Sequence, residues 1–396
     1  MNQKGNGLPL EGIRVLECSQ AVMGPTCGLV LADMGAEVIR VERAPEGDDT
    51  RRLKGFGKGF FPFFNRNKKS IAIDLKSKKG KRVLQKLITA ADVLLENFAP
   101  GTMERLGFGY PEASRINPRL IYCALKGFMP GPYEKRPALD EVVQMMGGLA
   151  YMTGPKGQPL RAGASVIDIM GGSYGVIGIL TALYEREKTG RGQYVVATLF
   201  ESTVFLMGQH MTFSAVTGEP APPMPERISA WAIYDRFETQ EGEMVFIGIT
   251  SDRHWARFCE TFQLPALARD ERLATNNDRI SHRAWLIPEL QKVFKAFPKK
   301  KLFQLCEKAE IPFAPIAKPE DLFDDPHLLH GGGLLETELP GGKKARLPRI
   351  PLRVGCYDFG LRSNPPELGE GSQELLQTLG FSREEIDALR REKILG

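Results

Sequence analysis

The sequence predicts an α/β protein with a Rossmann-like parallel sheet, and three neighbouring segments carry this prediction. Residues 12–18 (GIRVLEC) and 36–42 (AEVIRVE) are apolar runs typical of buried strands. Residues 24–34 between them are typical of a helix, with Pro25 in the first turn, where proline is tolerated. Strand, helix and strand within about thirty residues form a βαβ unit, and such units build parallel sheets covered by helices.

The chain then continues this alternation. We expect strands at 70–75, 92–97, 120–125 and 193–199, and helices at 78–90 and 171–185. The first strand–helix turn, residues 19–24 (SQAVMG), holds one glycine, whereas a dinucleotide-binding fold carries GxGxxG there. Binding of NAD or FAD is therefore disfavoured.

A proline-rich passage, residues 220–225 (PAPPMP), predicts a linker, because proline continues neither a helix nor a central strand. A chain of 396 residues is long for one core, so we expect two domains. Beyond the linker, a smaller α+β unit is expected. We expect this unit to contain strands at 232–237 and 243–249 and helices within 252–310. After it we expect strands at 333–338 and 344–347 and a final helix within 372–393.

The composition is that of an ordinary soluble protein, with 42% hydrophobic and 26% charged residues. No uncharged apolar stretch reaches the roughly 18 residues of a membrane span, and the first residues lack the apolar region of a signal peptide. The six cysteines are scattered without a CxxC pair, and the five histidines are scattered as well. We therefore expect a cytoplasmic protein without a metal site and without a membrane partner.

Basic residues concentrate near the N-terminus, although the net charge is only +5. Such a cluster forms either a solvated face or a binding site for a polyanion, which could be nucleic acid or a phosphorylated cofactor. Its members are Arg40, Arg43, Arg51, Arg52, Lys54, Lys58, Arg66, Lys68 and Lys69.

A single acid, Asp168, stands where an apolar run (164–167) meets the predicted long helix, and we predict that it is the reaction centre. A carboxylate is costly to desolvate, but the amides and dipole of a helix N-terminus stabilise its charge. Gly171 and Gly172 would let a bulky substrate approach without a Cβ in the way. The alternative is that Asp168 is simply the N-cap of the helix.

A set of segments distributed along nearly the whole chain occurs in a characteristic order. The segments are PLEGIRVL at 9–16, GAEVIRVE at 35–42, NRNKKSI at 65–71, ENFAPGT at 96–102, 140–147, Asp168 with Gly172, TGRGQ at 189–193 and LGE at 368–370. Taken together, these segments resemble the class III CoA-transferases, the family of formyl-CoA, carnitine and bile-acid CoA-transferases.

The resemblance implies a large Rossmann-like CoA-binding domain from residues 1–220 and 331–396, and a small α+β domain from 221–330. It also implies an interlocked homodimer and a CoA-transferase that moves CoA from an acyl-CoA thioester to a free carboxylic acid. CoA thioester is then a substrate, and no tightly bound cofactor is expected. The reaction would pass through covalent intermediates on Asp168, because a relay carboxylate divides a difficult exchange into easier steps.

The same resemblance assigns further site residues. Asp140 matches an acidic position that assists catalysis in formyl-CoA transferase, and it can equally be a structural helix cap. Val22 and the absence of a glycine-rich loop between Glu219 and Ala232 depart from the formyl/oxalate enzymes. Arg227 is a candidate clamp for the second carboxylate of a dicarboxylic acid. The remaining CoA-contacting positions are Arg43 and Arg105 at the nucleotide, Asn97 and Phe98 along the CoA arm, Ile73 near adenine, and Val22 itself.

Three alternatives remain beside this interpretation. An α-methylacyl-CoA racemase would need a histidine where Leu139 stands, and leucine moves no proton. A nucleic-acid-binding protein could use the phenylalanines of 60–64 beside the basic cluster, although these are expected to pack in the core or line the site. A CoA-binding protein without activity is the third.

Overall fold

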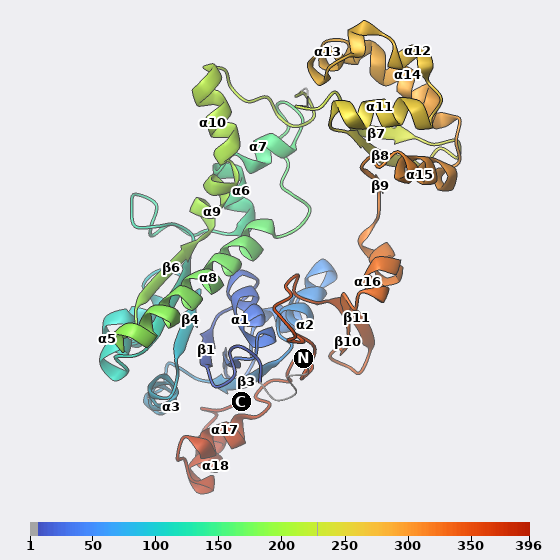
Figure 1. Cartoon of the computed structure of the whole chain (residues 1–396). Helices are drawn as coiled ribbons and strands as arrows, with labels where there is room; N and C mark the ends of the chain where they lie inside the picture. The colour runs from blue at the N-terminus through green and yellow to red at the C-terminus, as the bar shows by residue number, and fades with distance from the viewer. Residues whose placement is uncertain (1–6, 228) are drawn as a thin grey trace. The chain divides into compact units, whose positions relative to one another are not determined.

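The chain folds into two compact units, which are described separately below (Figure 1). The computed structural model describes residues 7–227 and 229–396. Unit 1 combines the chain up to Pro223 with Pro326–Gly396, and unit 2 is Met224–Asp325. Both ends of the chain therefore contribute to unit 1.

Unit 1 is built on a six-stranded parallel sheet with the order β3-β2-β1-β4-β5-β6. This confirms the predicted α/β class with a parallel sheet. The order reverses direction between β1 and β4, which is where α/β sheets open a crevice at their carboxyl edge. The strands are β1 Arg14–Cys18, β2 Glu37–Arg43, β3 Lys68–Ile73, β4 Val93–Glu96, β5 Ile121–Lys126 and β6 Tyr194–Thr198.

Helices connect these strands and cover the sheet. Pro25 lies in the first turn of α1 as predicted, and α8 ends at Gly190, whose φ of 69° suits the left-handed C-cap of a helix. The helices up to the linker are α1 Met23–Asp33, α2 Phe60–Phe64, α3 Lys78–Thr89, α4 Thr102–Leu106, α5 Tyr110–Ile116, α6 Asp140–Met146, α7 Leu149–Thr153, α8 Val166–Thr189, α9 Leu199–Leu206 and α10 Gly208–Thr217. Short 3₁₀ turns occupy Asp49–Arg52 and Gly55–Gly59.

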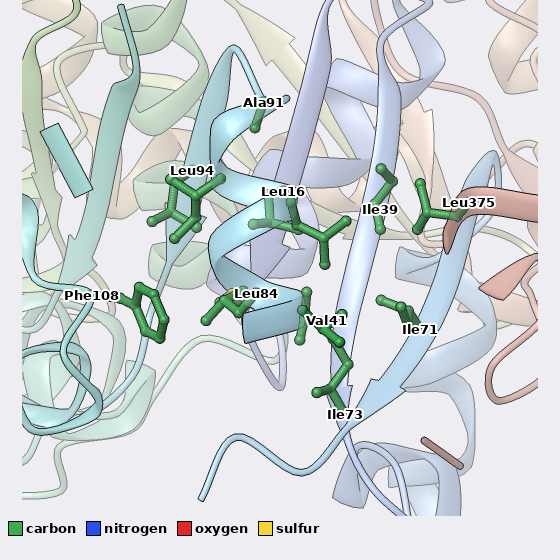
Figure 2. Packing of buried hydrophobic residues seen from close by; sticks show 14 of the residues in the cluster. Leu16, Ile39, Val41, Ile71, Ile73, Leu84, Ala91, Leu94, Phe108 and Leu375 are labelled. Carbon is green, nitrogen blue, oxygen red and sulfur yellow. The ribbon is translucent and has the colours of Figure 1, made fainter. Parts of the chain in front are cut away.

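Each face of the sheet has its own hydrophobic core, because neighbouring side chains on a strand point to opposite faces. Leu16 and Ile39 belong to the core with Leu84 of α3 and Leu375, as Figure 2 shows. The next residue back along β1, Val15, belongs to the other core, which includes residues of α1 and α8. Helices on both faces explain why the central strands β1, β4 and β5 are rich in apolar residues.

The residues after the second unit complete unit 1. The predicted final helix within 372–393 is wrong as a single helix, since two helices occupy this segment. Gly380, with a φ of 80°, interrupts the helical backbone, and Ser382 then starts the second helix through a capping box with Glu385. The elements are α16 Pro326–His330, the hairpin β10 Leu334–Glu338 and β11 Lys344–Pro348, α17 Ser372–Thr378 and α18 Arg383–Arg391.

Unit 2 is a three-stranded antiparallel sheet, in the order β7-β8-β9, packed against helices. Its core includes Trp255, Phe258 and Phe294, each of which is at most 5% exposed. The elements are β7 Ile233–Glu238, β8 Met244–Ile249, α11 Asp252–Thr261, α12 Pro265–Ala268, α13 Asn276–Ser281, α14 Arg283–Lys295, α15 Lys299–Lys308 and β9 Phe313–Pro315, with 3₁₀ turns at Glu271–Leu273 and Pro319–Asp324.

One helix among the described residues, α8, is long and apolar enough to cross a membrane by length and composition. Apolar core helices of globular proteins have the same property, and one side of α8 packs into the core through Ile167, Val176 and Ile179.

Candidate functional site

Asp168 lies in the first turn of α8, two residues after the first helical residue. The N-cap of this helix is Ser165, so the alternative that Asp168 is the N-cap is wrong. Its side chain is half-buried, and within residues 7–227 and 229–396 no group donates a hydrogen bond to its carboxylate. A half-buried carboxylate without hydrogen-bond donors is unusual for a structural acid.

The amides at the start of α8 are satisfied by another acid, Asp140. Its Oδ2 accepts hydrogen bonds from the backbone N–H of Ile167 at 2.9 Å and of Asp168 at 3.1 Å. Asp140 is the first residue of α6 and is 6% exposed. Of the two roles expected for Asp140, the structure therefore shows a helix cap, and the helix that it caps is α8 rather than its own.

Two residues that the sequence reasoning missed surround Asp140. Gln144, which is fully buried, donates a hydrogen bond to Asp140 Oδ1 and accepts one from the backbone N–H of Ala162 at 2.9 Å. The guanidinium of Arg161 lies 3.6 Å from Asp140 Oδ1. The i,i+4 spacing of Asp140 and Gln144 on one helix face was an available signal, whereas nothing local pointed to Arg161.

This environment perturbs the ionisation of Asp168. The pKa of Asp168 is raised to about 7, mainly by burial and also by the negative charge of Asp140, while the Arg161 guanidinium acts in the opposite direction. A carboxylate with this pKa exchanges its proton near neutral pH, and perturbed acids of this kind concentrate at functional sites.

Gly171 and Gly172 have a packing role in this structure. A Cβ on Gly172 would lie 2.6 Å from the carbonyl oxygen of Met23, and one on Gly171 would lie 2.6 Å from the end of the Met23 side chain. The steric argument from the sequence is corrected accordingly, because helix α1 fills the room that both glycines leave. The contact packs the second turn of α8 against the first turn of α1.

The first turn of α8 lies at the carboxyl edge of the sheet. Helix α8 leads through Gly190–Gly192 into β6, which runs parallel to β5, so its C-terminus lies at the amino edge. A helix of 24 residues spans about 36 Å, more than the length of these strands, and its N-terminus therefore reaches the opposite edge. The loop from β1 to α1 ends at this same edge.

A cavity of about 850 Å³ opens at the carboxyl ends of β1 to β4, where the strand order reverses. It is large enough for a small-molecule ligand. Three of the residues assigned to CoA binding, Arg43, Ile73 and Phe98, line it. The other lining residues are Ser19, Gln20, Val41, Glu42, Ala44, Glu46, Gly47, Asp48, Asp49, Asp74, Leu75, Lys76, Thr102 and Leu106.

Residues that the sequence predicts as CoA contacts form hydrogen bonds or ion pairs with residues that line the cavity. Asn97 makes two hydrogen bonds with the backbone of Gln20, at 2.9 and 2.8 Å, and so positions that cavity residue. Arg105 is exposed on α4 and donates to Thr102 Oγ1 at 2.8 Å. Arg43 is 60% exposed and pairs with Glu46 at 3.4 Å and with Asp49 at 3.2 Å.

Two other predicted residues are Val22 and Arg227. Val22 is 3% exposed and packs in a small apolar cluster with Leu29 and Phe64, which corrects its assignment to the CoA contacts. Arg227 is exposed and belongs to unit 2.

The N-terminal basic cluster is not a single binding face. Arg40, Arg66 and Lys68 are at most 3% exposed and pair with Asp48 and Glu17, with Asp33, and with Glu17, respectively. Burial lowers the pKa of Lys68 to about 8. Within the segment 60–64, Phe61 and Phe64 are buried and Phe60 and Phe63 are partly buried against the small apolar cluster of Val22 and Leu29. Exposed cations of the cluster, such as Arg43 and Arg52, remain at the surface.

No group of three or more His, Cys, Asp and Glu residues suited to a metal ion occurs in the described part of the chain.

Comparisons with known proteins agree on one family. The family model described as CoA-transferase family III matches residues 10–372. The chain is 32% identical to the succinyl-CoA:glutarate CoA-transferase of Homo sapiens, over 93% of this chain and 85% of that protein. It is 34% identical to the acetyl-CoA:oxalate CoA-transferase of Acetobacter aceti, over 88% of this chain and 90% of that protein.

A solved structure shows the same fold. A CAIB/BAIF family protein from Brucella suis superposes with a TM-score of 0.83 at 32% identity, covering 94% of this chain and 100% of that chain. The match of family and fold over nearly the whole length confirms the resemblance seen in the sequence. The chain belongs to CoA-transferase family III, and it is a class III CoA-transferase that moves CoA between acyl-CoA thioesters and carboxylic acids.

Proposed function

We propose that this enzyme transfers CoA to a dicarboxylic acid through covalent intermediates on the Asp168 carboxylate. The observation that carries the proposal is the half-buried Asp168 side chain, which has no hydrogen-bond donor in the described structure and has a pKa raised to about 7. The acids in the names of the two relatives, glutarate and oxalate, are dicarboxylic and support this acceptor class.

The reaction divides into two halves that conserve all atoms. Asp168 attacks the acyl-CoA carbonyl, forming an acyl–aspartyl anhydride and releasing CoA thiolate. The thiolate then attacks the aspartyl carbonyl, giving an enzyme–CoA thioester and the free donor acid. The acceptor carboxylate reverses these steps, so that CoA leaves as the acceptor thioester and the Asp168 carboxylate is restored.

The protein has to exclude water from the anhydride and stabilise the developing oxyanion. The burial of Asp168 supports the first requirement. We assign the adenosine phosphate part of CoA to the cavity at the carboxyl edge, with Arg43 as its phosphate-binding cation, Ile73 and Phe98 as apolar walls, and Asn97 and Arg105 as supporting residues. Arg227 stays a prediction as a clamp for the second carboxylate.

We also propose that the enzyme acts as a homodimer in the cytoplasm. Helices α8 to α10 expose large apolar side chains, which monomeric proteins rarely gather on neighbouring elements. These residues are Ile177 (57% exposed), Tyr184 (67%), Phe205 (72%), Met211 (58%) and Val216 (79%). A second copy of the chain is the partner that the family resemblance indicates for this apolar surface.

The racemase alternative is not favoured. Leu139 stands at the histidine position, is 71% exposed and carries no proton-transfer group. The relatives named above are transferases.

Peptide mass spectrometry tests the proposal. Wild-type protein is incubated with a panel of acyl-CoA thioesters, treated with hydroxylamine or borohydride, and digested. We expect a modified Asp168 with at least one thioester and none in Asp168→Asn. Glu187→Gln, which changes an exposed acid in the same helix, is the matched control and is expected to behave as wild type. An unmodified Asp168 with every thioester that the enzyme consumes would refute the covalent relay.

A further inference from the structure

Arg161, the cation beside Asp168, combines a backbone fixed by hydrogen bonds of its neighbours with a weakly held side chain. On one side of Arg161, the N–H of Leu160 donates to the carbonyl of Ala150 at 2.9 Å. On the other side, the N–H of Ala162 donates to the Gln144 side chain at 2.9 Å. Both flanking residues are thus tied to the α6–α7 segment, which fixes where the Arg161 side chain begins.

The guanidinium itself is not bound tightly. Its Nη2 lies 3.6 Å from Asp140 and its Nη1 lies 3.8 Å from Glu141, both beyond hydrogen-bond distance. Its Nε donates to the neighbouring Ala162 carbonyl at 3.0 Å, and across residues 7–227 and 229–396 its terminal nitrogens make no hydrogen bond. The side chain is 35% exposed, so a ligand can reach it.

Asp140 does not need Arg161 as a partner. Its Oδ1 accepts from Gln144, and its Oδ2 accepts from the amides of Ile167 and Asp168. A carboxylate with three hydrogen bonds is well satisfied, and the guanidinium beside it stays available for a planar anion, which it can bind through two parallel N–H groups.

We propose that Arg161 binds the reacting carboxylate, first that of the departing donor acid and then that of the acceptor acid, beside Asp168. This inference rests on the proposed function and specifies how that site takes its acid substrate. When CoA thiolate has converted the anhydride to the enzyme–CoA thioester, the donor acid is released as an anion close to the negatively charged Asp140. Arg161 offsets that repulsion and then presents the acceptor carboxylate to the same carbonyl carbon.

The charged groups that face Arg161 and Asp168 determine the pH at which the variants are compared. Asp140 and Glu141 come from α6, and Arg161 comes from the loop before α8. Removing Arg161 also removes a charge that favours ionised Asp168, so the comparison is made at about pH 9, where Asp168 is ionised in every variant.

Steady-state kinetics with both substrates varied tests the inference. Arg161→Gln is expected to raise the KM of the acceptor acid about tenfold or more and the inhibition constant of the product acid to a similar extent, while the KM of acyl-CoA changes less than about twofold. Arg161→Lys, which keeps the charge without the paired donors, should give an intermediate KM. Arg191→Gln, at the far end of α8, is the matched control and should match wild type.

The outcomes separate the two proposals. If wild type and Arg161→Gln both form the adduct on Asp168 and the acid KM is unchanged in the variant, the role of Arg161 is refuted while the covalent relay stands. A fall in kcat with both KM values unchanged also refutes carboxylate binding by Arg161, because that result indicates that Arg161 acts only on Asp168 and not on the acid substrate. If wild type forms no adduct with any thioester, the covalent relay fails, and this inference with it.

Discussion

Asp140 Oδ2 accepts a hydrogen bond of 3.1 Å from the backbone N–H of Asp168, which lies 28 residues later in the sequence. One acid therefore caps the helix that presents the other. The arrangement stabilises the first turn of α8 through hydrogen bonds, and the same negative charge makes ionisation of Asp168 less favourable. Both effects can be measured separately.

The pH dependence of the reaction should show this coupling. Asp168, as the proposed nucleophile, must be ionised, so kcat/KM is expected to rise with pH through about 7. Asp140→Asn keeps an acceptor for the amides and removes the charge, so the rise should move to lower pH. Burial, the larger cause of the shift, remains, so the new midpoint stays above the ordinary value of 3.8. A rise that stays in place or moves to higher pH would contradict the coupling. Glu141→Gln, at an exposed acid whose charge does not contribute to the shift of the Asp168 pKa, is the comparison.

The stability of Asp168→Asn should depend on pH. Because folding raises the pKa of Asp168, the unfolded chain ionises first, and wild type loses stability as pH rises from about 4 to about 7. Asp168→Asn does not lose this stability, because asparagine does not ionise. We expect the variant to be more stable by about 2 kcal/mol at pH 8, half of the ~4 kcal/mol maximum for such a shift, because the side chain is partly exposed. The gain should vanish near pH 4, as measured by urea unfolding. A gain in the free energy of unfolding that is the same at all pH values would show that it does not come from the raised pKa of Asp168.

The contact between α1 and α8 should tolerate little additional volume. Gly172→Ala places a Cβ 2.6 Å from the Met23 carbonyl oxygen and 2.9 Å from Thr26 Cβ, so the helices must separate. We expect a loss of about 1–3 kcal/mol in the free energy of unfolding. Gly208→Ala, where a Cβ would meet nothing within 4 Å, is the matched helix control and should lose no stability. Equal stability of both variants would show that α1 and α8 are not in tight contact.

Arg43 should contribute to binding of CoA rather than to chemistry. It lines the cavity and is paired only with exposed acids, so a phosphate can replace them. Arg43→Gln is expected to raise the KM of acyl-CoA about tenfold with kcat nearly unchanged, the pattern of lost uniform binding. The KM of the acid serves as an internal control and should not move. A loss confined to kcat would remove Arg43 from the phosphate site.

The apolar surface of α8 to α10 should be an interface between copies of the chain. Phe205→Asp places a charge at a side chain that is 72% exposed here, and we expect it to impair dimer assembly, so that light scattering after size-exclusion chromatography finds less dimer than in wild type. Met244→Asp, at a side chain in unit 2 that is 45% exposed, is the control for charge and solubility. A monomeric wild type, or a dimer that Phe205→Asp leaves intact, would rule out this interface.

Much of unit 1 could be predicted from local patterns. The βαβ unit, the helix begun near Pro25 and the end of α8 at Gly190 all depend on neighbours a few residues apart, and the structure confirms them. The final helix was the exception, because the backbone turns at Gly380 and the segment forms two helices.

The roles of charged residues were less predictable. Arg40, Arg66 and Lys68 have the composition of a polyanion site, yet each is buried against an acid distant in sequence. Gly171 and Gly172 suggested room for a substrate, and helix α1 occupies that room. In both cases the deciding partner lies on another element, and no local pattern identifies it.

The sequence by itself determined the α/β class, the family and the position of the single acid at the start of α8, because periodicity and ordered motifs are properties of the linear chain. Only the tertiary structure decided that Asp140 caps α8, that Gln144 holds Asp140, and that Arg161 is left with a loosely paired guanidinium beside Asp168. The reason is physical. Hydrogen bonds and charge–charge energies depend on distances of a few ångströms in space, and folding sets those distances between residues that the sequence keeps far apart.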